Sequence, residues 1–152
     1  MSAPRPAGPD EAPAVAALVD AAFAAYLPRL GRPPGPMLQD WAANVAAGEV
    51  VVVADETGAL DALARIVPEP EALLLDTLAV RPDRQGRGLG RALVAVAEDE
   101  ARRRGLARLR LYTNALMTEN VALYTRLGFV ETHRGGEPPY QRVFMEKAVP
   151  RP

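Results

Sequence analysis

The sequence predicts a mixed α/β fold. Three observations support this: a length of 152 residues, short apolar runs bounded by proline and glycine, and apolar residues at helical spacing between those runs. The apolar content of 49% and the charged content of 24% are those of an ordinary globular protein. We therefore expect a single domain over residues 1–152, with elements in the order α-α-β-β-β-α-β-α-β-β and a short edge strand near Arg5.

Proline, glycine and capping residues set the expected boundaries of these elements. Asp10 is a candidate N-cap, Pro28 ends the first helix, and Gly48 is the candidate C-cap of the second. The expected helices are 11–26, 37–47, a long helix ending before Gly105, and 120–127; the expected strands are 49–55, 61–67, 73–80, 108–113, 129–132 and 141–147.

Charged residues are expected on the exposed sides of the later elements. The long helix contains two pairs of opposite charge four residues apart, Glu98–Arg102 and Asp99–Arg103. This spacing predicts ion pairs on the solvent-exposed face of the helix. Strand 108–113 alternates strictly, so Leu109 and Leu111 should face the core. The loop 134–140 between the last two strands is expected to be mobile.

The chain is organised around the stretch 73–105, in which a strand, a glycine-rich loop and a helix follow one another. The loop reads Gln85-Gly86-Arg87-Gly88-Leu89-Gly90. Amides in such a loop and in the first helical turn have no intrahelical partner, and glycine lets an anion approach the backbone. This order of elements predicts an anion site, although a tight turn without a ligand stays open as the alternative.

Four arginines favour a diphosphate at this loop. Arg81, Arg84, Arg87 and Arg91 surround the turn, and in the sequence only Asp83 opposes them. A Walker loop needs Gly-Lys-Ser/Thr, whereas Gly90 is followed by Arg91 and Ala92. The dinucleotide fingerprint needs a third glycine at position 91 and a loop directly after the strand, so it also fails.

Composition excludes several other classes of site. There is no cysteine, so disulfides, a thiolate nucleophile and cysteine-ligated metals are excluded, and the single histidine, His133, cannot form a histidine-rich metal site. A net charge of −1 predicts no general attraction to nucleic acid or membrane, and no apolar run approaches the ~20 residues of a transmembrane helix. The N-terminus lacks the layout of a signal peptide, and we expect a soluble cytoplasmic protein without a metal.

Two motifs together resemble the GCN5-related N-acetyltransferase (GNAT) superfamily. The first is Arg84/Gln85-x-x-Gly88-x-Gly90, preceded by Leu78-Ala79-Val80-x-Pro82. The second is Ala122-Leu123-Tyr124-x-x-Leu127-Gly128-Phe129. The resemblance covers residues 10–148. It implies a mostly antiparallel central sheet of six to seven strands with about four helices, splayed between the fourth and fifth strands.

The resemblance also implies an acetyl-CoA site. The expected cofactor-binding residues are Leu78, Ala79, Val80, Gln85, Gly86, Arg87, Gly88, Leu89, Gly90, Arg91, Asn120 and Tyr124. The loop amides would hold the CoA pyrophosphate, and the main chain of residues 78–80 would pair with the pantetheine arm and polarise the thioester carbonyl.

Tyr124 is the expected general acid, because a phenol can protonate the leaving thiolate; packing in the core is the alternative role. Many relatives carry an asparagine seven residues before this tyrosine, and Met117 occupies that place here. Asn120 is instead a candidate for cofactor binding, and helix capping is its alternative role.

The residues of the acceptor side are less well marked. Asp76 lies on the same face of its strand as Leu78 and Val80 and is the first candidate for the general base, with His133 second. The resemblance places the acceptor at the loop after the first helix, where Tyr26 and Arg29 are the expected substrate-binding residues. Tyr26, Trp41 and Tyr140 are further candidates for an apolar wall, although the spacing of Trp41 favours the core.

The expected function is direct transfer of an acetyl group from acetyl-CoA to a primary amine, either a small molecule or a protein N-terminus or lysine. A non-catalytic acyl-CoA sensor and a structural domain without a ligand are the alternatives. The expected partners are acetyl-CoA and the amine, with neither nucleic acid nor membrane, and a homodimer is compatible with the sequence.

Overall fold

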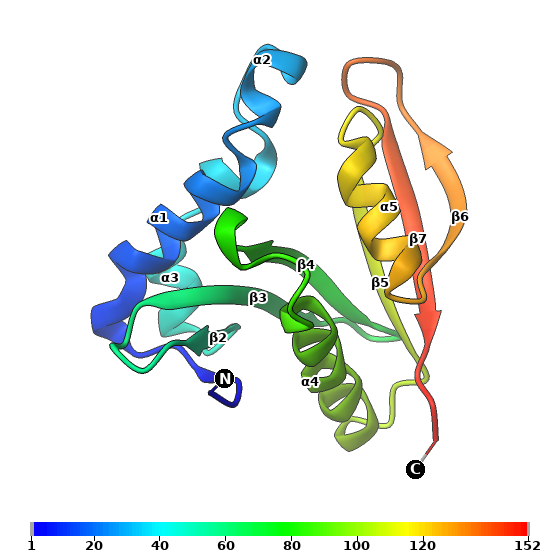
Figure 1. The fold of residues 1–152 in the computed structure, drawn as a ribbon. Coiled ribbons are helices and arrows are strands. Elements are labelled where there is room, and N and C mark those ends of the chain that lie inside the picture. The colour runs from blue at the N-terminus through cyan, green and yellow to red at the C-terminus, as the bar shows by residue number, and fades with distance from the viewer. Residues whose placement is uncertain (1, 152) are drawn as a thin grey trace. The chain divides into compact units, whose positions relative to one another are not determined.

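A computed structural model describes residues 2–151, which form seven strands, five α-helices and three short 3₁₀ turns (Figure 1). The strands are β1 Arg5–Pro6, β2 Val50–Ala54, β3 Leu60–Pro68, β4 Leu73–Val80, β5 Arg108–Asn114, β6 Val130–Gly135 and β7 Arg142–Ala148. The helices are α1 Ala12–Phe23, α2 Tyr26–Leu30, α3 Trp41–Ala46, α4 Leu89–Arg103 and α5 Thr118–Arg126; the 3₁₀ turns are η1 Pro9–Glu11, η2 Gly35–Leu38 and η3 Pro82–Arg84.

The strands join in the order β1-β2-β3-β4-β5-β7-β6, and only β4 and β5 are recorded as a parallel pair. This confirms the expected mixed and mostly antiparallel sheet. Among the described residues the parallel ladder joins Leu73 to Leu109 and Leu74 to Arg110, at the beginnings of both strands. The predicted splay between the fourth and fifth strands involves residues of both units and stays a prediction.

The chain divides into two compact units. The first contains the residues up to Ile66 together with Thr77–Leu93, and the second contains Val67–Asp76 together with the chain from Val94 onward. Strand β4 and helix α4 each contribute residues to both units.

In the first unit, α1 packs beside α3 and buries the apolar stripe that the sequence predicted, including Val15, Leu18 and Val19. Strands β2 and β3 form the expected hairpin, with Val50 opposite Arg65. The hairpin contains a bulge: Val53 pairs with Ala62 and Ala54 with Leu60, so Asp61 is an extra residue in β3.

Three expectations for the first unit were wrong at helix ends. Asp10 does not cap α1, because Pro9–Glu11 forms a 3₁₀ turn whose Glu11 carboxylate accepts a hydrogen bond from the Gly8 amide at 2.9 Å. Pro28 does not end a helix but is the third residue of α2, where the amide it lacks has no helical partner anyway. The predicted helix 37–47 is the 3₁₀ turn η2 followed by α3, whose N-cap is Asp40.

In the second unit, the ladder of β5 and β7 runs from Arg108 opposite Ala148 to Asn114 opposite Arg142. The burial of β5 alternates, with Leu109 and Leu111 inside as predicted. Figure 1 shows α5 lying along β5 and β7, with β6 beside β7. Helix α5 begins at Thr118, two residues earlier than expected, and β6 extends three residues beyond the predicted end at residue 132.

The ion pairs predicted within α4 were also wrong. Arg102 bonds to Asp99, and both Arg103 and Arg104 bond to Glu100. Glu98 instead pairs with Lys147 of β7, with 2.7 Å between Oε2 and Nζ. The carboxylate of Glu98 therefore joins α4 to the last strand.

Candidate functional site

The glycine loop begins where β4 ends. The Arg81 amide donates to the Asp61 carbonyl at 2.8 Å, and the Arg84 amide donates to the Arg81 carbonyl at 2.8 Å, which closes the turn η3. Gly86 and Gly88 both have φ near +80°, a left-handed conformation that side chains disfavour. These two glycines turn the chain sharply between η3 and α4.

The loop presents free backbone amides at the start of α4. The Ala92 amide donates to the Gly88 carbonyl at 3.0 Å, which is the first bond of the helix. The amides of Leu89, Gly90 and Arg91 come before that bond and have no helical acceptor. A Cβ placed on Gly86 or Gly88 would have no atom within 4 Å, so the space over the loop is open. Free amides and open space are features that an anion site needs, and the anion site itself stays a prediction.

The four loop arginines fall into two pairs. Arg81 makes two hydrogen bonds to Asp83, at 2.6 and 3.0 Å, and Arg84 makes one at 3.3 Å. The bond to Asp83 raises the pKa of Arg81, and the same bond lowers the pKa of the Asp83 carboxyl. Arg87 and Arg91 are exposed and make no hydrogen bond or ion pair within residues 2–151.

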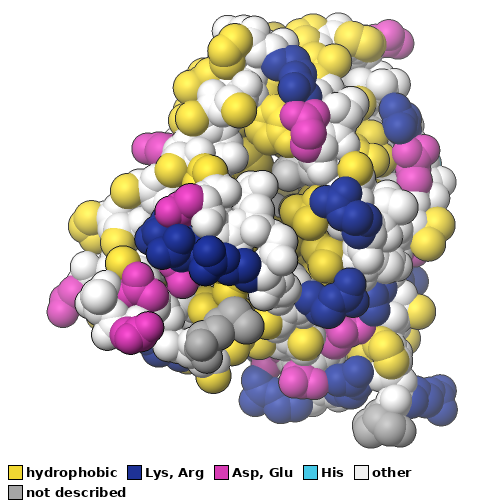
Figure 2. All heavy atoms as spheres, viewed as in Figure 1, with side chains coloured by type: hydrophobic (Ala, Val, Ile, Leu, Met, Phe, Trp, Pro, Cys, Tyr) yellow, Lys and Arg dark blue, Asp and Glu magenta, His cyan; other side chains and the backbone are white. Residues whose placement is uncertain are grey.

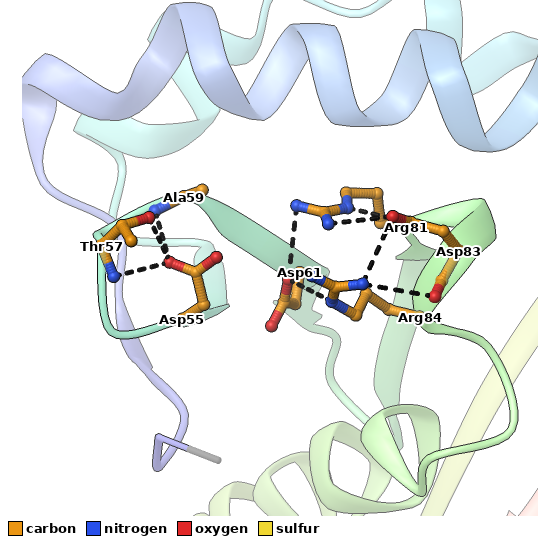
Figure 3. Close-up of polar contacts among 7 residues, drawn as sticks. All are labelled: Asp55, Thr57, Ala59, Asp61, Arg81, Asp83 and Arg84. Carbon is orange, nitrogen blue, oxygen red and sulfur yellow. Dashed lines mark hydrogen bonds and ion pairs between the residues drawn. The ribbon is translucent and has the colours of Figure 1, made fainter.

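A second carboxylate opposes the arginines. Oδ1 of Asp61 lies 3.4 Å from Nε of Arg84 and 3.6 Å from Nη1 of Arg81 (Figure 3). The expectation that Asp83 alone opposes the four arginines was therefore wrong. On the face shown in Figure 2, several Lys and Arg side chains lie beside Asp or Glu side chains. Arg87 and Arg91 are thus the loop cations that are left for an external anion.

The strand residues before the loop have the burial of an inner strand. Leu78 and Ala79 are buried, and Val80 is half-buried. Asp76 is also half-buried, and it belongs to the second unit whereas residues 77–80 belong to the first.

Tyr124 lies in the second unit, on α5, and only 4% of it is exposed. Its ring meets that of Phe129 edge to face, with 5.8 Å between centroids. The Tyr124 carbonyl accepts the amides of Leu127 at 3.1 Å and Phe129 at 3.0 Å. The Leu-Gly-Phe motif is therefore the turn that closes α5, and Gly128 has a φ of +100° there.

Asn120 does not cap this helix. The N-cap position is Met117, which is buried, and Asn120 is the third residue of α5 and half-buried. The capping role that the sequence left open for Asn120 was therefore wrong, whereas its proposed role in cofactor binding is unaffected.

The acceptor candidates differ in exposure. Tyr26 is buried, with the guanidinium of Arg29 5.3 Å from the centre of its ring. Trp41 is a core residue, as its spacing indicated, and its Nε1 donates to the Pro36 carbonyl at 2.9 Å. Tyr140 is 55% exposed. His133 is exposed and stacks on Phe144 at 4.3 Å.

The structure gathers the predicted loop residues in the first unit, and Asp76, Asn120 and Tyr124 belong to the second. Sequence reasoning missed Asp61. The available signal was a carboxylate at the beginning of a mostly apolar strand, 61–67.

Comparison with known proteins identifies the family of this chain. A family model described as "Acetyltransferase (GNAT) family" matches residues 15–129, which is most of the chain. The chain belongs to the GNAT family. That match includes the glycine loop and ends at Phe129, the last residue of the tyrosine motif.

Curated relatives match over shorter segments. The [Ribosomal protein bS18]-alanine N-acetyltransferase of Escherichia coli is 48% identical over 61 residues, which are 40% of each chain. Mycothiol acetyltransferase of Nocardia farcinica is 45% identical over 56 residues, which are 37% of this chain and 18% of that protein. The matched segments thus span less than half of either relative.

Two solved structures match over nearly the whole length of this chain. The E. coli ribosomal-protein-S18-alanine N-acetyltransferase has a TM-score of 0.73 and 25% identity, covering 100% of this chain and 96% of that one. The PaiA N-acetyltransferase of Thermoplasma acidophilum in complex with coenzyme A has a TM-score of 0.76 and 14% identity, covering 97% and 99%. The latter likeness shows a shared fold.

Proposed function

We propose that the chain transfers an acetyl group from acetyl-CoA directly to a primary amine. The observation that carries this proposal is the loop 85–91. Its amides at the start of α4 have no helical acceptor, the space over its two left-handed glycines is open, and Arg87 and Arg91 make no ion pair within the described residues. Membership of the GNAT family and the coenzyme A named with a solved structural neighbour support acetyl-CoA as the donor.

The loop would bind the donor through its backbone. Amides from Gly86 to Arg91 would hold the pyrophosphate, with Gln85, Arg87 and Arg91 at its edge. The main chain of Leu78, Ala79 and Val80 would bond to the pantetheine arm, and Asn120 would contact the same arm. An amide of this strand would polarise the thioester carbonyl and stabilise the oxyanion that forms on attack.

Two side chains would move protons. The amine attacks the thioester carbon, and the tetrahedral intermediate then expels the thiolate of CoA. Tyr124 would give its phenolic proton to that thiolate, and the burial of its ring supports a role in which the hydroxyl is shielded from bulk water. Asp76 would accept the proton that the amine loses.

The acceptor would be a small amine, a protein N-terminus or a lysine, and Tyr26 and Arg29 would bind it. The names of the curated relatives support a protein acceptor and a small-molecule acceptor. One name specifies the alanine of a ribosomal protein, and the other specifies mycothiol. A single catalytic domain, a homodimer, a cytoplasmic location and the absence of nucleic-acid and membrane partners stay predictions.

Calorimetric titration of acetyl-CoA, followed by a screen of amines for release of free CoA, tests this proposal. Binding with turnover on at least one amine is expected. No binding at millimolar acetyl-CoA would refute the donor site, whereas binding without turnover on any amine would indicate an acyl-CoA sensor.

Gly88→Glu tests the loop itself. A carboxylate beside the diphosphate should weaken acetyl-CoA binding by at least about a hundredfold, because like charges at an interface cost several kcal/mol. Gly58→Glu is the matched control, because Gly58 has a φ of +90° and open space but lies in the β2–β3 turn. Equal losses in the two variants would refute the assignment.

A further inference from the structure

Asp61 is a carboxylate that the proposed chemistry does not use. It lies on β3, and 8% of the residue is exposed. Its Oδ1 is buried and has no hydrogen-bond partner within residues 2–151. A buried carboxylate needs compensation from nearby cations or donors, so the groups around Asp61 indicate what it does.

The bulge in the β2–β3 hairpin places Asp61 toward the loop. Because Val53 pairs with Ala62 and Ala54 with Leu60, Asp61 has no partner across β2. Bulges bend a strand and redirect a side chain, and they are enriched beside active sites. At this bulge both ends of Asp61 reach the loop: the carbonyl accepts the Arg81 amide at 2.8 Å, and the carboxylate faces two guanidiniums.

Asp61, Asp83, Arg81 and Arg84 form one neutral group, which we call the arginine clasp. Figure 3 shows the side chains of Arg81 and Arg84 converging on Asp61 from one side and on Asp83 from the other. Asp61 is the member of the clasp that belongs to β3, whereas the other three lie at the turn η3, which leads into the loop. The clasp therefore fastens the loop to β3.

We propose that Asp61 is a positioning residue, which holds the start of the loop against β3 so that the amides from Gly86 to Arg91 are already arranged before a ligand arrives. Arranging the amides in advance lowers the ordering cost of binding. The consequence for acetyl-CoA rests on the proposed function, whereas the consequence for the free loop does not.

Asp61→Asn tests this proposal in the free protein. The substitution keeps the size and the carbonyl of residue 61 and removes the charge that faces the guanidiniums. The amides of Arg81 and Arg84, both hydrogen-bonded, should exchange with solvent roughly tenfold faster, measured by NMR hydrogen exchange. Unchanged exchange at both amides would overturn the proposal.

Asp55→Asn is the matched control. Asp55 belongs to the same hairpin and its Oδ1 accepts bonds from Thr57 and Ala59, at 2.8 Å from the Thr57 amide and 3.1 Å from the Ala59 amide (Figure 3). Within residues 2–151 it makes no hydrogen bond or ion pair with either arginine, and its electrostatic interaction with Arg81 is weaker than that of Asp61, so the exchange of Arg81 and Arg84 should change far less than in Asp61→Asn. Equal acceleration in both variants would mean a general loosening of the hairpin and would overturn the role of Asp61.

Kinetics supply the second readout. Asp61→Asn should raise the KM for acetyl-CoA roughly tenfold with kcat unchanged, because the lost arrangement of the loop affects binding and not proton transfer. A fall in kcat at unchanged KM, or tighter binding of acetyl-CoA, would overturn the proposal; the latter would mean that Asp61 restrains arginines that otherwise bind phosphate.

Two further controls keep the outcomes distinct. If Asp61→Asn does not fold, Arg84→Gln leaves Asp61 paired with Arg81. It should still accelerate exchange of the amide at position 84, relative to the intrinsic rate of glutamine, and failure to do so would overturn the proposal. If the unaltered protein does not bind acetyl-CoA, the proposed function fails, while the exchange experiment still decides whether Asp61 holds the loop.

Discussion

Gly128→Ala tests how the turn after α5 is held. Gly128 has a φ of +100°, and a Cβ there would lie 2.8 Å from Cε of Lys147. That lysine cannot move away freely, because its Nζ is bonded to Glu98 at 2.7 Å and both side chains are largely buried, with 18% and 13% exposed. The added methyl group must therefore displace the ion pair as well as strain the backbone.

The expected loss is the sum of two terms. A left-handed alanine costs about 1–2 kcal/mol. Separating a largely buried ion pair adds about 1–2 kcal/mol. This value lies between the contribution of a surface ion pair, which is small, and the cost of about 3–5 kcal/mol for leaving a buried charge without its partner. We expect the free energy of unfolding to fall by about 3 kcal/mol, which for a chain of this length lowers Tm by roughly 9 °C.

Urea denaturation and calorimetry measure this loss, and Gly105→Ala provides the control. Gly105 follows α4 with a φ of +70°, and a Cβ there would have no atom within 4 Å. Its substitution should cost only the backbone term, about 1–2 kcal/mol. In a Lys147→Ala background the two glycine substitutions should cost the same, because the obstructing side chain is gone.

Two results would refute this reasoning. One is a loss for Gly128→Ala no greater than that for Gly105→Ala in the unaltered protein. The other is an excess loss at Gly128 that persists in the Lys147→Ala background, since the excess would then arise elsewhere.

Three further predictions concern single interactions. Hydrogen bonds from Arg5 and then from the Gly8 amide lower the pKa of Glu11 from 4.5 to about 2, so the stability this carboxylate adds is present above pH 4.5 and lost as the pH falls toward 2. Because Arg5 is partly exposed, Glu11→Gln should cost only about 1 kcal/mol of unfolding free energy at pH 7 and almost nothing near pH 2, and a loss independent of pH would contradict this. Tyr124→Phe should keep the Kd of acetyl-CoA and lower kcat at least about tenfold, and unchanged kcat would remove Tyr124 from the mechanism. Asp40→Ala removes the N-cap bond to the Ala43 amide and should cost about 1 kcal/mol in urea denaturation. Asp10→Ala, at the cap the sequence favoured, should cost less than about 0.5 kcal/mol, and the reverse order would show that the caps are misassigned.

The sequence predicted the elements whose signals are local. Strand β4 has the predicted bounds, Leu73–Val80, because its apolar run is followed by a proline turn that stops pairing. The glycine-rich loop after it was likewise recognisable from a short pattern. Pro28 misled the helix prediction because the same residue that breaks a helix interior is tolerated in a first turn.

Pairing between distant residues could not be read from the sequence. Glu98 has Arg102 at helical spacing, yet its partner is Lys147, 49 residues away. Asp61 lies in a predicted strand, and nothing nearby in the sequence shows that a bulge turns it toward Arg84. Local propensity sets elements, but the contacts between elements decide which charges neutralise one another.

The division of the chain into two units has a consequence for protein engineering. Neither unit is a continuous segment, because the backbone passes from one to the other after Ile66, after Asp76 and again after Leu93. No single cut of the polypeptide can therefore release an intact unit. If the gene were divided at one point to make a split reporter, neither half would contain both units complete. The two halves would have to associate in order to fold. Cleavage in the loop 136–141 would instead remove only β7 and the C-terminal residues, which leaves the first unit whole.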